Sequence, residues 1–178
     1  GEYLLYHCSG ELDDTDSGNW NKHVVVALDD DEDPRDFDMQ LINDKPAFVY
    51  SRGVSGSTRD QARYKEFTGT DLGSESSWGD VFVQGVKESI IDDRLRLKFD
   101  KLGVPYVLHN WYTTANGQED RFIIYPTSYT GRFSYENWSE GTNFLGYEFD
   151  EPQEMSLEFL QNGNALIFTN TYPNKSFN

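Results

Sequence analysis

The stretch Met39–Tyr50 (MQLINDKPAFVY) alternates apolar and polar residues, turns on Asn-Asp, and returns as an apolar run. Alternation followed by an Asn, Asp or Gly turn and a second β-rich run predicts a β-hairpin. Leu95–His109 (LRLKFDKLGVPYVLH) and Met155–Phe168 (MSLEFLQNGNALIF) follow the same plan. The chain therefore contains three predicted hairpins of one type, each with turn residues between an alternating strand and a return strand.

These hairpins recur at equal steps. Pro46 and Pro105 occupy the same place after the turn, Asn164 occupies it in the third copy, and the steps are 59 residues. Tyr3–Tyr6 resembles the return strand without its partner. Further strands are predicted after the return strands, and Gly/Ser/Asp-rich loops separate the units; these strands are His23–Leu28, Ala62–Phe67 and Arg121–Tyr125.

A repeated plan of several short strands and a polar loop is typical of propeller blades of about four strands. We therefore predict an all-β chain of β-propeller-like repeats, with antiparallel sheets forming about three blades, incomplete at both ends. Residues 1–178 form one β-repeat region, and its units are 1–36 (partial), 37–92, 93–152 and 153–178 (partial). A β-sandwich with similar hairpins is the alternative. A fragment of a longer protein, a ring completed by other copies, and an open stack of sheets all remain open.

Composition limits the possible partners. The 178 residues carry 31 acidic and 15 basic side chains, a formal charge of -16, so nucleic acid and anionic membranes are disfavoured partners. Aromatic residues make up 15% of the chain, which argues against disorder. Cys8 is the single cysteine and cannot form an intrachain disulfide. No apolar run reaches the roughly 20 residues of a membrane span.

The stretch Phe48–Tyr64 (FVYSRGVSGSTRDQARY), followed by Trp78, resembles the BNR-repeat propellers, which include sialidase-like proteins and polysaccharide lyases of the ulvan-lyase type. Leu102–Trp111 is similar to the Gly-x-x-His-x-x-Trp strand of a following blade. The resemblance covers about residues 38–112, and the sialidase Asp-box is not matched. It implies a secreted protein that binds polysaccharide; two glycosylation-type triplets, at Asn137 and Asn174, also favour secretion.

Pairs of chemistry-bearing residues lie two positions apart on the return strands, which places each pair on one face of its strand. Tyr50 with Arg52, and His109 with Trp111, are such pairs. An aromatic ring can pack against the C–H face of a sugar, and Arg can bind a carboxylate through two donors. A lyase needs that carboxylate neutralised before a His or Tyr removes the neighbouring proton.

The resemblance accordingly implies His109, Tyr50 and Arg52 as catalytic residues, and Trp111, Arg121 and Tyr64 as substrate-binding residues. Each has a plainer alternative, since Tyr and Arg on a strand often serve packing and ion pairing, and His109 sits in an apolar run. No metal site is expected. The acidic runs Asp13–Asp16 and Asp29–Asp33 offer oxygen ligands suited to calcium, but neither has the spacing of a calcium-binding loop.

Two functions remain open from the sequence. The first is a secreted carbohydrate-active unit, such as part of a polysaccharide lyase acting on an acidic glycan. The second is a non-catalytic module, lectin-like or structural, that self-associates through open blade edges, because unpaired strand edges are templates for pairing. Whether the chain is an enzyme is left open, and the expected partners are a glycan and further copies of the chain.

Overall fold

The computed structural model describes residues 1–8, 19–54, 61–85, 94–113, 118–139, 142–143 and 155–169. Within these ranges the regular elements are β-strands and three short 3-10 turns, so the predicted all-β class is confirmed. The strands are β1 (Glu2–Cys8), β2 (Trp20–Ala27), β3 (Glu32–Ile42), β4 (Lys45–Val54), β5 (Gln61–Phe67), β6 (Trp78–Gly85), β7 (Arg94–Phe99), β8 (Pro105–Thr113), β9 (Gln118–Ile124), β10 (Thr142–Asn143), β11 (Met155–Phe159) and β12 (Ala165–Thr169).

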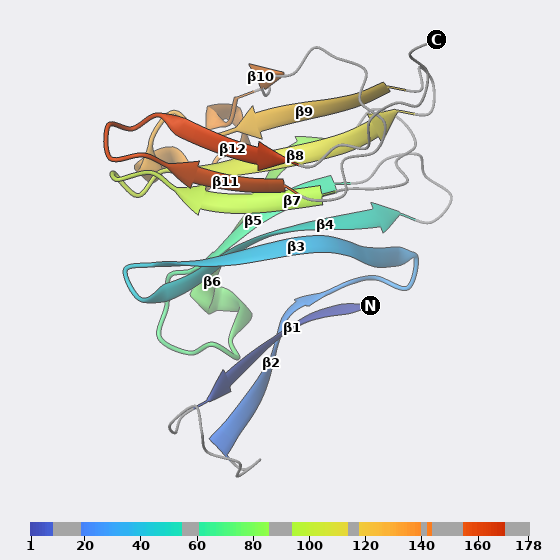
Figure 1. Ribbon diagram of the computed structural model, residues 1–178. Helices are drawn as coiled ribbons and strands as arrows, with labels where there is room; N and C mark the ends of the chain where they lie inside the picture. The colour runs from blue at the N-terminus through green and yellow to red at the C-terminus, as the bar shows by residue number, and fades with distance from the viewer. Residues whose placement is uncertain are drawn as a thin grey trace.

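The strands form four antiparallel sheets, none of them closed on itself. The N-terminal hairpin is β1–β2, the first four-stranded sheet is β3–β4–β5–β6, the second is β7–β8–β9–β10, and the C-terminal hairpin is β11–β12. Neighbours in each sheet are consecutive in the chain, so every sheet is a simple meander. Figure 1 shows the four sheets following one another, with the N-terminal hairpin and the C-terminal hairpin at opposite ends.

All three hairpins predicted from the sequence are present, as β3–β4, β7–β8 and β11–β12. The first turn has two residues with left-handed backbone, Asn43 (φ 50°) and Asp44 (φ 60°), as a tight hairpin turn requires. In the longer turns, Gly103 (φ 79°) and Gly163 (φ 88°) take this role. Pro46 lies opposite Leu41, Pro105 opposite Phe99 and Ala165 opposite Phe159, so these equivalent positions of the return strands are 59 and 60 residues apart.

The partial first copy aligns differently from the sequence prediction. Cys8 lies opposite Trp20 just as Phe67 lies opposite Trp78, and the register shift between Tyr3 and Leu4 reproduces the shift between Ala62 and Arg63. The N-terminal hairpin is therefore equivalent to β5–β6, the third and fourth strands of a sheet. Equating Tyr3–Tyr6 with the return strand β4 was wrong, because short apolar runs look alike in β4 and β5.

The predicted unit boundary between residues 36 and 37 also needs correction, since it falls inside β3, which runs from Glu32 to Ile42. The first five residues of this strand, Glu32 to Asp36, are four charged residues and a proline, which hid its start from the apolar pattern. The boundaries at 92/93 and 152/153 lie outside the described residues.

Buried side chains fill the spaces between successive sheets. The largest cluster contains ten buried residues from the two four-stranded sheets, including Val49, Tyr64 and Leu97, together with Trp138. A second cluster joins the N-terminal hairpin to the first four-stranded sheet, and Leu108 and Leu157 join the second sheet to the C-terminal hairpin. The first strands β3, β7 and β11 lie successively against one another.

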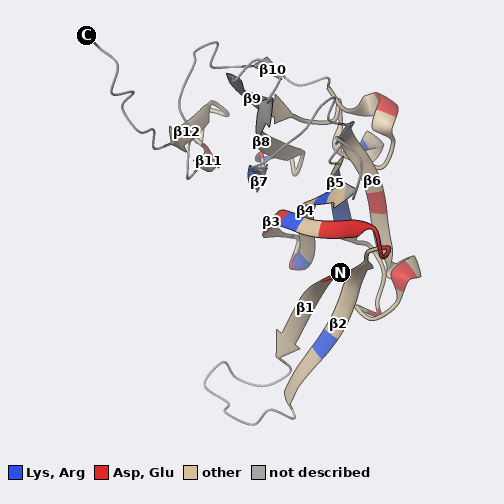
Figure 2. Ribbon diagram, turned by 90° about the vertical axis from the view of Figure 1, so that its right-hand side faces the viewer, with Lys and Arg blue, Asp and Glu red and all other residues tan. Residues whose placement is uncertain are grey.

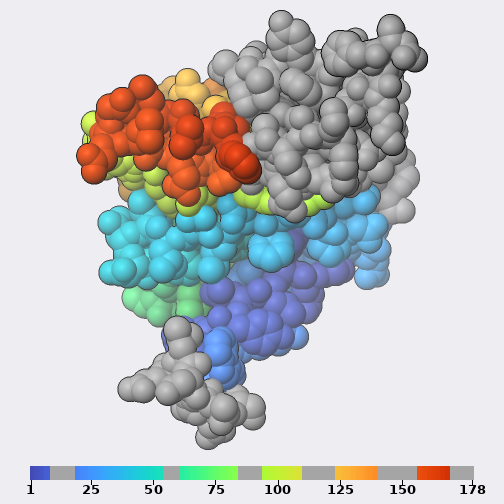
Figure 3. Space-filling view, in the orientation of Figure 1, coloured from blue at the N-terminus to red at the C-terminus, as the bar shows by residue number. Residues whose placement is uncertain are grey.

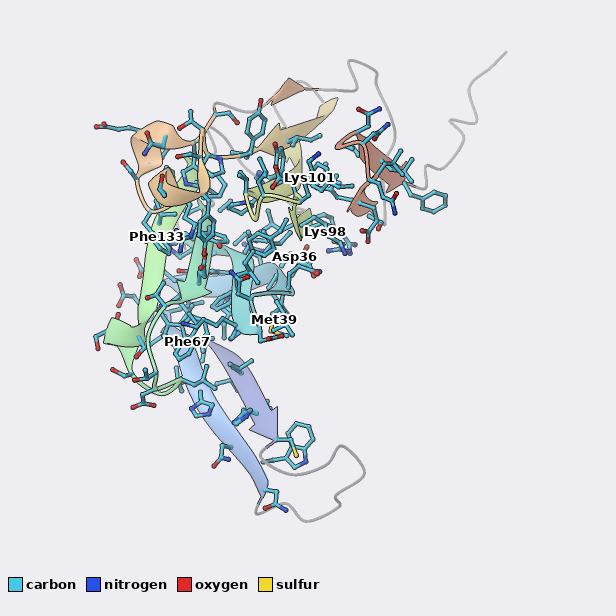
Figure 4. All side chains as sticks on the ribbon, turned by 90° about the vertical axis from the view of Figure 1, so that its left-hand side faces the viewer. Asp36, Met39, Phe67, Lys98, Lys101 and Phe133 are labelled. Carbon is cyan, nitrogen blue, oxygen red and sulfur yellow. The ribbon has the colours of Figure 1, made fainter. Side chains whose placement is uncertain are left out.

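Side chains also satisfy the open edge of a strand across one of these junctions. The carboxylate of Asp36 accepts a hydrogen bond from the backbone N–H of Leu95 (2.7 Å), and that of Asp38 accepts one from Leu97 (2.8 Å). Carboxylates on β3 therefore pair with N–H groups at the edge of β7 that would otherwise lack a ladder partner. In Figure 4, Asp36 lies on the side of β3 toward the second sheet.

Candidate functional site: a cationic pocket between the N-terminal hairpin and the first sheet

A pocket of about 310 Å³ lies between β2 and the first four-stranded sheet. Its wall on the β2 side is mainly apolar and its wall on the sheet side is mainly charged; the lining comprises Val24, Val25, Val26, Ala27, Tyr50, Arg52, Arg63, Lys65, Gly73, Glu75 and Asp80. The charged side chains come from neighbouring strands in register, with Tyr50 opposite Arg63 and Lys65 opposite Asp80. Cross-strand pairing thus concentrates them on one face of the sheet.

Three cations converge here in a chain of net charge -16. The Arg63 Nε lies 3.0 Å from Asp80 Oδ1, and Lys65 Nζ lies 3.8 Å from Asp80 Oδ2. The Lys65 side chain is only 6% exposed, and its nitrogen stands beyond hydrogen-bonding distance of that carboxylate. Burying an ammonium is costly unless it is compensated, which makes this lysine a natural partner for a bound anion.

Arg52 is held at the edge of the same pocket. Its Nη1 lies 2.8 Å from Glu32, and its Nε and Nη2 donate to the Gln61 side-chain oxygen at 3.1 and 2.8 Å. Two partners fix the plane of the guanidinium and leave part of its fork of five donors unused by them. Glu32 also accepts a hydrogen bond from the Asp29 backbone N–H, so two residues of the acidic run Asp29–Asp33 contribute to this arrangement.

Tyr50 presents its phenol to this charged wall. Its O–H group donates to Asp80 Oδ2 (3.3 Å), while its ring packs against Tyr3 and Phe48. Burial, together with the negative charge of Asp80, raises the pKa of Tyr50 far above its ordinary value, although Arg63 and Arg52 act in the opposite direction. A phenol with a raised pKa stays protonated at neutral pH, so it is suited to donate a hydrogen bond rather than to remove a proton.

His109 lies in a different junction from Tyr50 and Arg52. It is fully buried on β8 opposite Leu95, and Leu95 belongs to the cluster between the two four-stranded sheets. Tyr50 instead faces the N-terminal hairpin from the other side of the first sheet. The structure therefore brings together two of the three predicted catalytic residues and buries the third, His109, at another junction.

Tyr64 is fully buried on the face of the first sheet opposite to the pocket, within the cluster between the two four-stranded sheets. Its phenol donates to the carboxylate of Glu66. Arg132 grips the same carboxylate through Nε–Oε2 (2.6 Å) and Nη2–Oε1 (2.9 Å), and the Tyr129 phenol donates to it at 2.8 Å. Burial alone would raise the pKa of Glu66, but these hydrogen bonds and the arginine charge lower it. Tyr64 thus belongs to a closed internal network.

The remaining predicted residues are placed only in part. Trp111 and Arg121 occupy β8 and β9, where Trp111 pairs with Asp120 and Arg121 with Asn110, and their side chains lie outside the described residues. The Asp13–Asp16 run lies outside them as well. Within the described part of the chain, no group of three or more metal-ligating side chains occurs. No helix of that part is long and apolar enough to cross a membrane.

Lys65 and Asp80 were missed by the sequence analysis, although their positions carry a signal. Asp80 is the one charged residue of Trp78–Val83, and Lys65 lies beside Glu66 between the aromatic residues Tyr64 and Phe67. A charge at a position that period two turns inward is expected to be paired. Figure 2 shows basic residues on β5 and acidic residues on the neighbouring strand β6, the two strands that pair Lys65 with Asp80.

Comparison with known proteins adds no assignment. No family model, no curated protein and no solved structure matches this chain. The resemblance to BNR-repeat propellers, which rests on the residues around Arg52 and His109, therefore stays a prediction. The function has to be argued from the pocket itself.

Proposed function

We propose that the protein is a secreted, β-propeller-like module that binds an acidic glycan without cleaving it, holding a sugar carboxylate in the cationic pocket. The observation that carries this proposal is the convergence of Arg52, Arg63 and Lys65 on one pocket, with a nearly buried lysine ammonium. A volume of about 310 Å³ is at the lower end of ligand pockets, which suits a single sugar residue.

Each wall supports one part of a uronate sugar. The cations and the Tyr50 phenol offer donors for the carboxylate and the hydroxyl groups. The β2 wall of Val24, Val25 and Val26 offers an apolar surface for the C–H face of the ring. The net excess of cations over carboxylates in the lining, three against two, favours an anionic ligand despite the acidic chain.

A binding role is favoured over a lyase because neither base predicted from the sequence is set to remove a proton in this pocket. Tyr50 stays protonated, and the Asp80 carboxylate is paired with Arg63 and Lys65. His109, the other candidate base, is enclosed between the two four-stranded sheets. Binding and cleavage are distinguished by following unsaturated sugar products in the same experiment.

The test is calorimetric titration of the chain with oligogalacturonate and with its neutral methyl ester. We expect binding of the charged oligomer alone, reduced about tenfold or more by Arg63→Gln and weakened by salt. Arg96→Gln is the matched control, since Arg96 has a similar exposed fraction and pairs with Asp36 at 3.4 Å outside the pocket. Equal binding of the ester, or equal losses in both variants, would contradict the proposal; unsaturated products would favour the lyase.

A further inference from the structure

Two apolar surfaces are exposed, one on β3 and one on β12. On β3, the side chains of Phe37, Met39 and Leu41 are 59%, 44% and 63% exposed. On β12, Leu166 and Phe168 are 54% and 76% exposed. Alternate large apolar side chains on one face of a strand form a contiguous patch, and such patches mark interaction surfaces. In Figure 4, Met39 lies on the side of β3 toward the N-terminal hairpin.

The internal repeat shows what covers the β3 surface. Leu95 and Leu97 of β7 lie 58 residues after Phe37 and Met39 and hold the same positions in their hairpin. Both are fully buried, in the cluster that includes Ala47 of the second strand β4. The apolar side of a first strand therefore packs on the second strand of the preceding sheet.

The same repeat shows what covers the β12 surface. Leu108 of β8 packs against Leu157 of β11, and the ring of Tyr106 lies 4.7 Å from that of Phe159. Their counterparts, 60 residues further along the chain, are the exposed residues of β12, namely Leu166 and Phe168. The exposed side of β12, the second strand of its sheet, thus matches the side on which the first strand of a following sheet packs. The exposed side of β3, the first strand of its sheet, matches the side that the second strand of a preceding sheet covers.

The backbone edges are complementary in the same way. In both four-stranded sheets the second strand pairs with the third, as β4 with β5 and β8 with β9. β12 is a second strand, and β1 is equivalent to the third strand β5. Among the described residues, β1 pairs with β2 and β12 pairs with β11, which leaves one edge of each without a described ladder partner.

The space beside β1 has the shape this pairing needs. A pocket of about 350 Å³ lies between β1 and β3, and Tyr3, Leu5, Phe37, Met39 and Phe48 are among its lining residues. A second strand placed there would pair with β1 and lie under the exposed side chains of β3. Figure 3 shows the C-terminal hairpin and the N-terminal hairpin on either side of β3, so one chain does not bring β12 to this pocket.

We propose that β12 of one copy enters the pocket between β1 and β3 of a second copy. The order β11–β12–β1–β2 then completes a four-stranded sheet across the junction, and Leu166 and Phe168 cover Phe37 and Met39. This is a head-to-tail contact, which closes into a ring or continues as a filament. The described strands of one copy amount to three four-stranded sheets, so two copies joined at both junctions would have six, within the 4–8 blades of propellers.

The junction is independent of glycan binding and is tested by solution mass. Light scattering on a size-exclusion column should give twice the mass of the chain for the native protein. Phe168→Asp and Met39→Asp should each give monomers, because each places a charge in one half of the junction. Leu102→Asp is the matched control, since Leu102 is an exposed apolar residue in the β7–β8 turn, outside the junction. Thermal unfolding of each monomer confirms that it is folded.

Mixing the two monomeric variants provides the decisive result. The intact β12 of the Met39→Asp chain and the intact pocket of the Phe168→Asp chain should restore one junction, giving a dimer in the mixture at concentrations where each variant alone is monomeric. A native monomer, an open-ended series of masses, a dimer that either variant leaves intact, or a mixture without dimer would overturn the proposal.

The strand register gives a second, independent test. Val49 lies opposite Tyr64, and their counterparts across the junction are Phe168 and Leu5, so these two residues should lie opposite each other. In a Cys8→Ser background, the pair Leu5→Cys and Phe168→Cys should form a disulfide-linked dimer on oxidation. The pair Leu5→Cys and Leu166→Cys, displaced by two positions, should cross-link poorly. Equal cross-linking of both pairs would overturn this register.

Discussion

The two faces of the first four-stranded sheet use charged residues in opposite ways. Toward the second sheet, both carboxylate oxygens of Glu66 accept hydrogen bonds from Arg132. The same carboxylate also accepts hydrogen bonds from two phenols within a closed core. Toward the N-terminal hairpin, Lys65 on the adjacent position stands 3.8 Å from Asp80 beside an open pocket. Neighbouring residues of one strand thus serve stability on one face and leave binding capacity on the other.

The difference follows from how completely each charge is satisfied. A buried ion pair offsets its desolvation cost only when its geometry is good and further hydrogen bonds use the remaining lone pairs. Glu66 meets this condition, and the stacked guanidinium of Arg132 lies 3.6 Å from the Tyr129 ring centroid. Lys65 does not meet it with the neighbours that the structure describes, and it lines a pocket of about 310 Å³.

The largest expected effect on stability comes from removing the Glu66 carboxylate, which Arg132 and two phenols share as an acceptor. Glu66→Ala should lower the free energy of unfolding by about 3–5 kcal/mol, because it leaves the guanidinium of Arg132 and two phenols without their shared acceptor. Denaturant titration measures this, with Glu158→Ala as a control on an exposed carboxylate. A loss below about 1 kcal/mol would show that the Glu66 network contributes no more than a surface pair.

Acidification should produce a smaller loss at the same place. Because the folded-state pKa of Glu66 is lowered, its contribution to stability is present above the unfolded pKa and is lost as the pH falls through the folded value. The difference in unfolding free energy between the native chain and Glu66→Gln should therefore be constant near neutrality and shrink below about pH 4. A difference that does not change in acid would contradict the lowered pKa.

On the face of the first four-stranded sheet that packs toward the second sheet, side-chain packing should tolerate little change. A Cβ at Gly79 would clash with the Phe133 ring, which packs against the core between the two four-stranded sheets (Figure 4). Gly79→Ala should cost about 1–3 kcal/mol of unfolding free energy through overpacking. The double variant Gly79→Ala with Phe133→Leu should recover part of this loss, and no recovery would place the strain elsewhere.

The smallest effect on stability is expected from the partly exposed ion pair between Lys98 and Glu158. Lys98 Nζ lies 2.7 Å from Glu158, whose side chain is more than half exposed, at the junction with the C-terminal hairpin. Exposed pairs contribute about 0–1 kcal/mol, so Lys98→Ala should leave the thermal midpoint almost unchanged. A loss comparable to that of Glu66→Ala would show that this junction depends on charge rather than on the Leu108–Leu157 contact.

Much of the strand plan was predictable from the sequence. The hairpins at Met39–Tyr50, Leu95–His109 and Met155–Phe168 followed from period-two alternation and from Asn, Asp and Gly at the turns, and all three are present. The start of β3 was missed because its first residues are charged, and its apolar alternation begins only at Phe37. Local pattern identifies strands well where one side is apolar and poorly where both sides are polar.

The candidate site was predictable only in part. Period two correctly placed Tyr50 and Arg52 on one face of a strand, and they line the same pocket. The alignment of His109 with Tyr50 also holds, since both take the same position in their hairpins 59 residues apart. The predicted site that combines His109 with Tyr50 and Arg52 is nevertheless not formed. Equivalent positions in successive sheets lie in different junctions, which are separated by a sheet and its side chains.

By itself, the sequence determined the all-β class, the three hairpins and the side of each strand on which a residue lies, because backbone pleating and turn geometry are local. Only the tertiary structure decided which sheet each side meets. It paired Lys65 with Asp80, enclosed Glu66 with Arg132, and identified β1 with β5 through a shared register shift. Those contacts join residues far apart in the chain, and their energies depend on burial and geometry that no local pattern contains.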